Sequence, residues 1–253
     1  MAGPEEQIPL DEAALLIAAE ANTGLDVSAQ LARLDDVAVR IGPTDSDRLC
    51  HFVFQTLGVR GDEQTYDDPR NSYLDQVLDR RLGIPISLSV LLMEIGRRCG
   101  VPLEGVGMPG HFLVRDPTRP DLLIDAFSGG TLLDRAACGR LLQTVAGAEV
   151  QLQPAFLAPV GTRAILLRML TNLDHSFRRR SDEHGVRWVS RLRCAIPGQS
   201  VVDRMALADT LARLGDVEEA AALLEELARE PETTAAAARD LHARARGLLA
   251  RFN

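Results

Sequence analysis

The fold is decided by residues 84–115, which contain Ile84-Pro-Ile-Ser-Leu-Ser-Val-Leu-Leu-Met-Glu-Ile-Gly-Arg-Arg-Cys-Gly100 and then Gly105-Val-Gly-Met-Pro-Gly-His-Phe-Leu-Val-Arg115. Residues 86–99 are apolar on nearly all sides, which predicts a buried helix. Its last turn contains Arg97 and Arg98, and Gly100 follows directly after it, as is usual where a helix ends. The apolar period then changes to two over 103–107, 111–115 and 122–126, which predicts strands joined by turns. A buried helix followed by an antiparallel meander indicates an α+β domain.

The flanking segments extend this domain on both sides. Before it, apolar residues at helical spacing predict three helices within residues 10–57. In residues 58–71 the apolar residues recur at neither helical nor strand spacing, which predicts a long ordered loop. A short amphipathic helix is predicted to follow at 72–81. After the meander we expect a helix at 132–145, and the pattern also allows a last strand at 150–153.

The rest of the chain is predicted to be helical and carries a repeat. Pro197 and Pro231 are 34 residues apart, and 34 is the tetratricopeptide period. The copy at 207–223 has the helix–glycine–helix form of such a repeat, whereas the preceding copy is degenerate, so a plain helical bundle is the alternative. We therefore expect a first domain over residues 1–155 and an all-α, tetratricopeptide-like domain over 156–253.

Composition limits the functions that the chain can have. It has 253 residues, of which 46% are hydrophobic and 25% charged, which is typical of a globular protein. Its net charge of -8 disfavours nucleic acid and anionic membrane surfaces as partners. All 28 basic residues are arginine, which excludes lysine chemistry. The five histidines and four cysteines show no metal-binding spacing, and no phosphate-binding glycine loop occurs, so we expect neither metal nor cofactor. No apolar stretch is long enough to span a bilayer and the N-terminal residues do not form a secretory signal, so we expect a cytoplasmic protein.

Chemistry is expected first at His111, which opens an apolar strand directly after a Pro-Gly turn. Asp125 lies 14 residues later, on the next predicted strand. That separation suits a strand–turn–strand return, so the Asp125 carboxylate is placed to fix the tautomer of the His111 ring. The other interpretation is a buried histidine that a carboxylate satisfies for structural reasons alone.

A nucleophile for that pair would have to come from the first turn of the buried helix, where Ser87 stands. A serine there also caps a helix, and a serine gains less than a cysteine from a helix N terminus. Glu94 lies on the same helix and needs a positively charged partner. The loop before the helix adds the polar side chains of Tyr66, Arg70, Asn71 and Tyr73. Together with Glu94 and Gly110 these form the predicted ligand-binding set, although a rigid structural loop has the same composition.

Three segments carry a resemblance to a known family. They are Tyr66-Asp-Asp-Pro-Arg-Asn-Ser-Tyr-Leu-Asp-Gln-Val-Leu78, Arg80-Arg-Leu-Gly-Ile-Pro-Ile-Ser-Leu-Ser89 and Gly105-Val-Gly-Met-Pro-Gly-His-Phe-Leu-Val-Arg115. They resemble the SirB-type transglutaminase-like proteins, and Leu166-Leu-Arg-Met-Leu-Thr-Asn-Leu173 extends the likeness into the helical part. The resemblance implies a transglutaminase-like, papain-like core followed by tetratricopeptide-like repeats.

The resemblance also implies an order of catalytic residues: cysteine at the start of the buried helix, histidine on a strand and aspartate on the next strand. His111 and Asp125 match the last two, but Pro85 or Ser87 stands where the cysteine belongs. We therefore expect a pseudoenzyme, a non-catalytic or regulatory module that binds a peptide in its cleft and a protein partner through the repeats. The alternative is a hydrolase or acyltransferase that uses Ser87 as nucleophile, His111 as base and Asp125 to orient the base.

Overall fold

The computed structural model describes residues 8–197 and 200–250, and these residues divide into two compact units, one ending at Ser176 and the other beginning at Phe177. The boundary falls inside a helix and lies later than the expected boundary at residue 155. The reason is that the strand and helix after residue 155 pack onto the first unit. Among the described residues, no helix is both long enough and apolar enough to cross a membrane.

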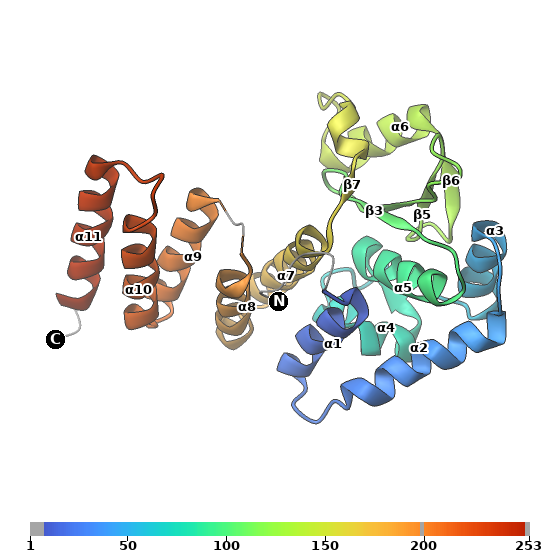
Figure 1. Ribbon diagram of the computed structural model, residues 1–253, viewed down its shortest axis with the longest axis horizontal. Coiled ribbons are helices and arrows are strands. Elements are labelled where there is room, and N and C mark those ends of the chain that lie inside the picture. Colours follow the sequence, from blue (N-terminus) through green and yellow to red (C-terminus); the bar gives the residue numbers. More distant parts are fainter. Residues whose placement is uncertain (1–7, 198–199, 251–253) are drawn as a thin grey trace. The chain divides into compact units, whose positions relative to one another are not determined.

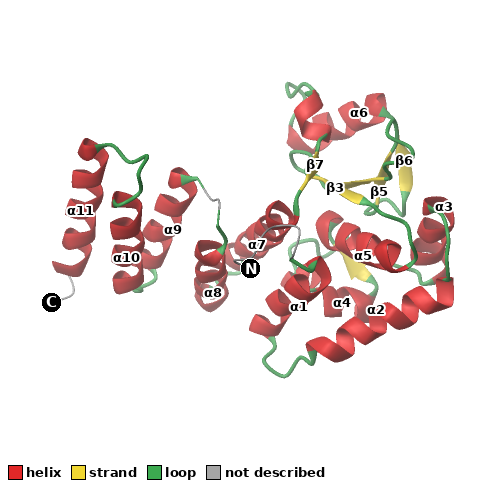
Figure 2. Cartoon of the chain, in the orientation of Figure 1, coloured by secondary structure: helices red, strands yellow, loops and turns green. Residues whose placement is uncertain are grey.

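The first unit begins with helices that surround a central one (Figures 1 and 2). The elements before the sheet are α1 (Leu10–Ala21), α2 (Val27–Ile41), α3 (Ser46–Cys50), the π-helical η2 (His51–Thr56), β1 (Arg60–Gly61), the 3-10 helix η3 (Pro69–Ser72), α4 (Leu74–Arg80), β2 (Leu82–Gly83) and α5 (Pro85–Arg98). Helix α5 packs against α1, α2 and α4 and against two strands of the sheet. Its side chains are buried on nearly all sides, which confirms the buried central helix.

A five-stranded antiparallel sheet follows α5, with its strands in the order β6-β5-β4-β3-β7. Its elements are β3 (Glu104–Val106), β4 (Leu113–Arg115), β5 (Leu123–Asp125), β6 (Thr131–Leu133), α6 (Arg135–Ala146), the 3-10 helix η4 (Pro154–Leu157) and β7 (Pro159–Val160). The α+β class and the meander over β3, β4 and β5 are as the sequence predicts.

Of two predicted elements next to the sheet, the strand is wrong and the helix is present but begins later than expected. The expected strand at 150–153 has no strand pairing, because Val150 and Leu152 instead pack against the apolar cluster under α6. The edge strand is β7, whose Val160 pairs with Gly105. The helix expected from residue 132 begins at Arg135, since Thr131–Leu133 is recruited as β6 by pairing with β5.

The second unit contains the end of α7 (Thr162–Arg179) and four further helices, namely α8 (Glu183–Ala195), α9 (Val201–Arg213), α10 (Val217–Ala228) and α11 (Ala235–Ala250). Helices α9, α10 and α11 share one apolar core that includes Leu207, Leu224 and Leu241. Gly185 of α8 sits against the ring of Phe177, where a Cβ atom would come within 2.4 Å of that ring. The described residues of the unit are therefore all-α, and short turns join α7 to α8 and α9 to α10.

Candidate functional site

The candidate site lies at His111, directly after the turn Met108-Pro109-Gly110 and two residues before β4, so the strand expected over 111–115 begins later than predicted. The backbone N–H of His111 donates to the carbonyl of Met108 at 3.1 Å, and Gly110 adopts a positive φ of 74°. A Cβ atom on Gly110 would also lie only 2.9 Å from Val145, so glycine is required here for two reasons. Gly110 thus sets the position of His111, and its ligand-binding role stays a prediction.

Asp125 ends β5 and holds the His111 ring. The distance between Nε2 of His111 and Oδ1 of Asp125 is 2.9 Å, and the two residues are 6% and 2% exposed. The hydrogen bond expected between them is therefore present. An ionised carboxylate only accepts hydrogen bonds, so Nε2 donates to Asp125, and Nδ1 carries the lone pair in the neutral form of the ring.

The carboxylate of Asp125 is itself held by the turn after β5. Its oxygens accept from the N–H groups of Phe127 and Ser128 at 3.0 and 3.3 Å and from the Ser128 hydroxyl at 2.8 Å. Burial alone raises the pKa of Asp125, but the hydrogen bonds from His111 and Ser128 outweigh it and hold that pKa below its usual value. The carboxylate therefore stays ionised and keeps the tautomer of His111 fixed.

Two aromatic rings connect His111 to the loop before α4. The ring of Phe127 meets the His111 ring edge-on at a centroid distance of 6.2 Å, and Tyr66 meets Phe127 in the same way at 5.9 Å. Tyr66 is 44% exposed, whereas His111 is buried. Tyr66 thus brings a partly exposed side chain to the site, and its ligand-binding role stays a prediction.

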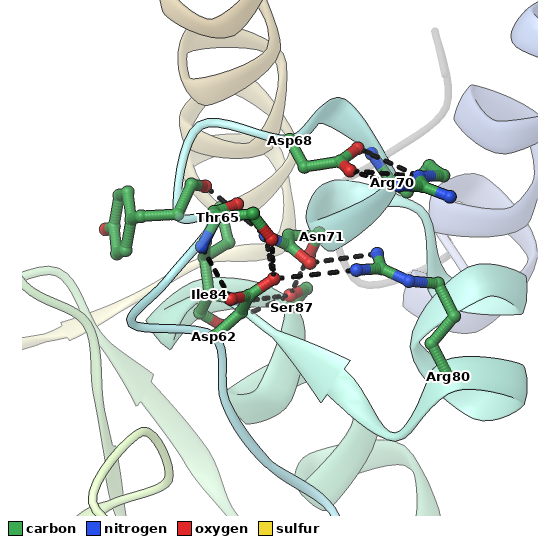
Figure 3. A network of polar contacts seen from close by, with 9 residues as sticks. Asp62, Thr65, Asp68, Arg70, Asn71, Arg80, Ile84 and Ser87 are labelled. Carbon is green, nitrogen blue, oxygen red and sulfur yellow. Dashed lines mark hydrogen bonds and ion pairs between the residues drawn. The ribbon is translucent and has the colours of Figure 1, made fainter.

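Ser87 is in the first turn of α5, where the sequence places it, but its hydroxyl is used by the backbone. Its Oγ donates to the carbonyl of Asn71 at 2.5 Å and accepts from the N–H of Ile84 at 3.1 Å (Figure 3). The residue is fully buried, and among the described residues it makes no hydrogen bond to His111. This is the capping arrangement that was the other interpretation of Ser87.

Asn71 is the centre of a buried network in the loop (Figure 3). Its amide nitrogen donates to Asp62 at 3.1 Å and to the carbonyl of Thr65 at 2.7 Å, and its amide oxygen accepts from Arg80 at 2.9 Å. Asp62 also accepts from the N–H of Thr65 at 2.8 Å. Since Asn71 has no exposed surface, its side chain holds the loop against α4 and α5 and does not face a ligand.

The remaining predicted ligand-binding residues are not gathered at His111. Arg70 has an exposed side chain that pairs with Asp68, and Tyr73 is buried and caps α4, where its carbonyl accepts from Val77. Glu94 lies seven residues beyond Ser87, about 10 Å along the axis of α5. It borders a separate cavity of about 630 Å³ whose lining includes neither His111 nor Asp125.

Glu94 belongs to an ion cluster at the C-terminal half of α5. Its carboxylate pairs with Arg97 at 2.9 Å and with Arg98 at 3.1 Å, and both arginines also reach Asp11. Burial and the charge of Asp11 raise the pKa of Glu94 in spite of the two guanidinium groups. The predicted positively charged partner of Glu94 is confirmed, and the cluster joins α1 to α5.

The thiols are poorly placed for nucleophilic chemistry. Burial raises the pKa of Cys138, and the charges of Asp134 and Asp125 raise it further. Burial also raises the pKa of Cys99 and raises that of Cys50 to about 12. Because the thiolate is the reactive form, these environments keep the thiols inert. In the part of the chain that the structure describes, no group of three or more His, Cys, Asp or Glu side chains could hold a metal ion.

Sequence reasoning missed Phe127, Ser128 and Asp62. The pair Phe127 and Ser128 had a signal, because Asp125-Ala-Phe-Ser-Gly-Gly130 has the composition of a turn in which an aspartate accepts from the N–H groups that follow it. For Asp62 the sequence shows only an acidic residue in a loop, and no pattern distinguishes it from the other acidic residues there.

Comparisons with known proteins identify relatives over most of the chain. A family model described as the transglutaminase-like superfamily matches residues 19–171. A UPF0162 protein of Xylella fastidiosa strain 9a5c is 39% identical over 204 residues, which cover 76% of this chain and 71% of that protein. A UPF0162 protein of Pseudomonas aeruginosa is 38% identical over 177 residues, or 67% of this chain and 65% of its own length.

Another relative, human F-box only protein 21, is a much longer protein. It is 36% identical over 136 residues, which make up 50% of this chain but 21% of that protein. No solved structure matches the chain.

Proposed function

Because this chain belongs to the transglutaminase-like superfamily and to the UPF0162 proteins, we propose that it is a SirB-like, non-catalytic member that binds a peptide segment beside His111. One observation carries the proposal. The imidazole of His111 is held by Asp125, while the hydroxyl of Ser87, one of the two positions expected for the missing cysteine, is bonded to the backbone of Asn71 and Ile84. A histidine that is oriented in this way, but has no nucleophile within hydrogen-bonding distance among the described residues, is suited to binding and not to acyl transfer.

The chemistry of the site favours a peptide as the ligand. Nδ1 of His111 can accept a hydrogen bond from a peptide N–H, since Nε2 carries the proton. The edges of Phe127 and Tyr66 offer an apolar surface next to it. Aromatic groups beside a few fixed polar groups are typical of sites that bind small segments. The proposal needs no cofactor, and it retains the cytoplasmic location that the sequence predicts.

The second unit is proposed to bind a protein partner. Its helices fit the tetratricopeptide-like reading, in which Leu214-Gly215 turns α9 into α10 and small residues such as Ala220 allow close packing.

Peptide binding is tested by selecting linear peptides from a random displayed library with the full chain. We expect enriched peptides whose affinity falls about tenfold or more with Tyr66→Ala, which corresponds to roughly 1.4 kcal/mol. Val39→Ala is the matched control, because Val39 is 81% exposed on α2. Failure to enrich any peptide, or equal loss with both variants, would overturn the proposal.

The role of the second unit is tested with the same full chain. If a protein partner is captured, Val202→Asp should abolish its capture and Val39→Asp should not, since Val202 is 75% exposed on α9. Equal capture by both variants removes the second unit from the proposal.

The hydrolase alternative would require Ser87 to release both of its backbone partners and turn toward His111. Treating the full chain with a fluorophosphonate probe separates the two functions. We expect no labelling of Ser87. Labelling that is lost in both Ser87→Ala and His111→Ala would establish the hydrolase and exclude the non-catalytic module.

A further inference from the structure

Arg168 lies on α7, in the segment Leu166–Leu173 that carries part of the family resemblance and that the proposed function leaves unused. Its side chain is half-buried, yet its guanidinium makes neither a hydrogen bond nor an ion pair with any residue that the structure describes. Arg98 shows the usual solution for such a group, since it pairs with Asp11, Asp35 and Glu94. A partly desolvated cation without a counter-ion is costly. A fold that retains one has a place for an anion.

The face of α7 that carries Arg168 lies against the loop before α4. Arg168, Asn172 and Ser176 are four residues apart and so share one face of the helix. The hydroxyl of Ser176 donates to the backbone carbonyl of Asp67, which fixes this face against the loop. Asn172, between the other two, is half-buried, and its amide has no hydrogen-bond partner among the described residues.

Tyr66 connects this face of α7 to the His111 site. Burial raises the pKa of the Tyr66 hydroxyl and the charge of Arg168 opposes that rise, so the two side chains are within electrostatic range of each other. On its other side the Tyr66 ring contacts Phe127, which contacts His111. Hydrogen-bond donors that have no partner in the described part of the chain thus border the proposed peptide site.

We propose that Arg168, Asn172 and the Tyr66 hydroxyl form a subsite for a carboxylate of the bound peptide. This inference rests on the proposed function and names the group that the peptide must carry. A guanidinium binds a carboxylate through two parallel hydrogen bonds, and the amide and phenol add neutral donors. A phosphate is disfavoured, because a single cation faces the additional charge while Asp67 and the net charge of -8 repel it.

The subsite is tested by titrating the full chain, labelled with ¹⁵N-arginine, with three tripeptides. They are N-acetyl-Ala-Glu-Ala-amide, N-acetyl-Ala-Gln-Ala-amide and N-acetyl-Ala-Gln-Ala with a free C terminus. The Nε–H signal of Arg168 is assigned by its loss in Arg168→Lys. We expect both carboxylate peptides to shift this signal saturably and to bind at least about fivefold more tightly than the neutral peptide. The tighter of the two shows whether a side chain or the C terminus is preferred.

Variants of the full chain separate the subsite from nonspecific attraction. Arg168→Met should remove the preference for carboxylate peptides, Arg168→Lys should retain part of it, and Arg140→Met, at an exposed arginine of α6, should leave it unchanged. Thermal unfolding of each variant verifies the fold. An unchanged preference in Arg168→Met, or no shift of the Arg168 signal with either carboxylate peptide, overturns the subsite.

The ring signals of His111, recorded in the same titrations, distinguish the two proposals. If all three peptides perturb His111 with equal affinity, the peptide site stands and the carboxylate subsite is wrong. If carboxylate peptides shift Arg168 without affecting His111, the anion subsite stands and peptide binding beside His111 is wrong. If neither residue responds, both proposals fail.

Discussion

Two buried polar networks of the first unit differ in how many of their hydrogen-bonding groups have a partner within the protein. In the loop network, Asn71 is bonded through its amide nitrogen, its amide oxygen and its backbone carbonyl, all to groups of the protein. In the His111 network, Asp125 is equally saturated, but His111 uses only one ring nitrogen. Buried groups that satisfy one another hold a fold together. A buried group with one position left open is where a ligand can be expected.

The largest effect that can test this comparison is expected from Asn71→Ala. Removing the amide leaves Asp62 and Arg80 short of a partner in a buried place, so we expect a loss of about 3 kcal/mol in the free energy of unfolding. Urea unfolding, followed by the circular dichroism of the full chain, measures it. A loss comparable to that of an exposed substitution would show that the loop network does not hold the fold.

Asp125→Asn is expected to cost less, about 2 kcal/mol at neutral pH, since an amide can accept only part of the four hydrogen bonds that the carboxylate receives. The effect depends on pH because the pKa of Asp125 is lowered in the folded state. The stability that the carboxylate contributes is fully present above its unfolded pKa of about 3.9 and is lost as the pH falls below that value.

Unfolding of the wild type and Asp125→Asn between pH 7 and pH 3 follows this difference directly. The gap between the two proteins should narrow toward pH 3. If the difference in the free energy of unfolding were constant over this range, the charge of the Asp125 carboxylate would contribute nothing to stability.

The sequence predicted those parts of the fold in which apolar residues recur at regular spacing or in which a glycine marks the end of a helix. The buried α5 and the strands β3, β4 and β5 follow from apolar spacing, and Gly100 marks the end of the helix region. The strands β6 and β7 could not be predicted, because their side chains are mostly exposed and so carry no apolar alternation, unlike the buried β3, β4 and β5. Each exists through pairing with a neighbour.

The candidate site divides in the same way. The contact between His111 and Asp125 was expected from a strand–turn–strand return, and in the structure Asp125 ends β5 while His111 is held by the turn that precedes β4. The direction of the Ser87 hydroxyl did not, because it depends on where the carbonyl of Asn71 comes to lie. That carbonyl is positioned by a loop in which Asn71 contacts Asp62 and Arg80. Contacts between residues so far apart in the chain cannot be predicted from the local sequence.

A smaller effect is expected from the two serines of α5, which differ in whether their hydroxyls are satisfied. Ser87 bonds to two backbone groups, whereas the hydroxyl of Ser89 is buried without a hydrogen-bond partner among the described residues. Ser87→Ala should cost about 1 kcal/mol, because it leaves the N–H of Ile84 and the carbonyl of Asn71 unpaired. Ser89→Ala should be neutral or slightly stabilising. Equal losses in urea unfolding would contradict the assignment of Ser87 as a cap.

The smallest effect on stability is expected from Arg70→Ala. This variant compares a polar contact at the surface with the two buried networks. The side chain of Arg70 is 59% exposed and pairs with Asp68, a surface ion pair of the kind that contributes little. Asp68 also accepts from the backbone N–H of residue 70 at 2.9 Å, and that bond survives the substitution. We therefore expect no resolvable change in the unfolding midpoint. If peptide binding nevertheless weakens, Arg70 belongs to the binding surface, since loss of the loop structure would have lowered the midpoint as well.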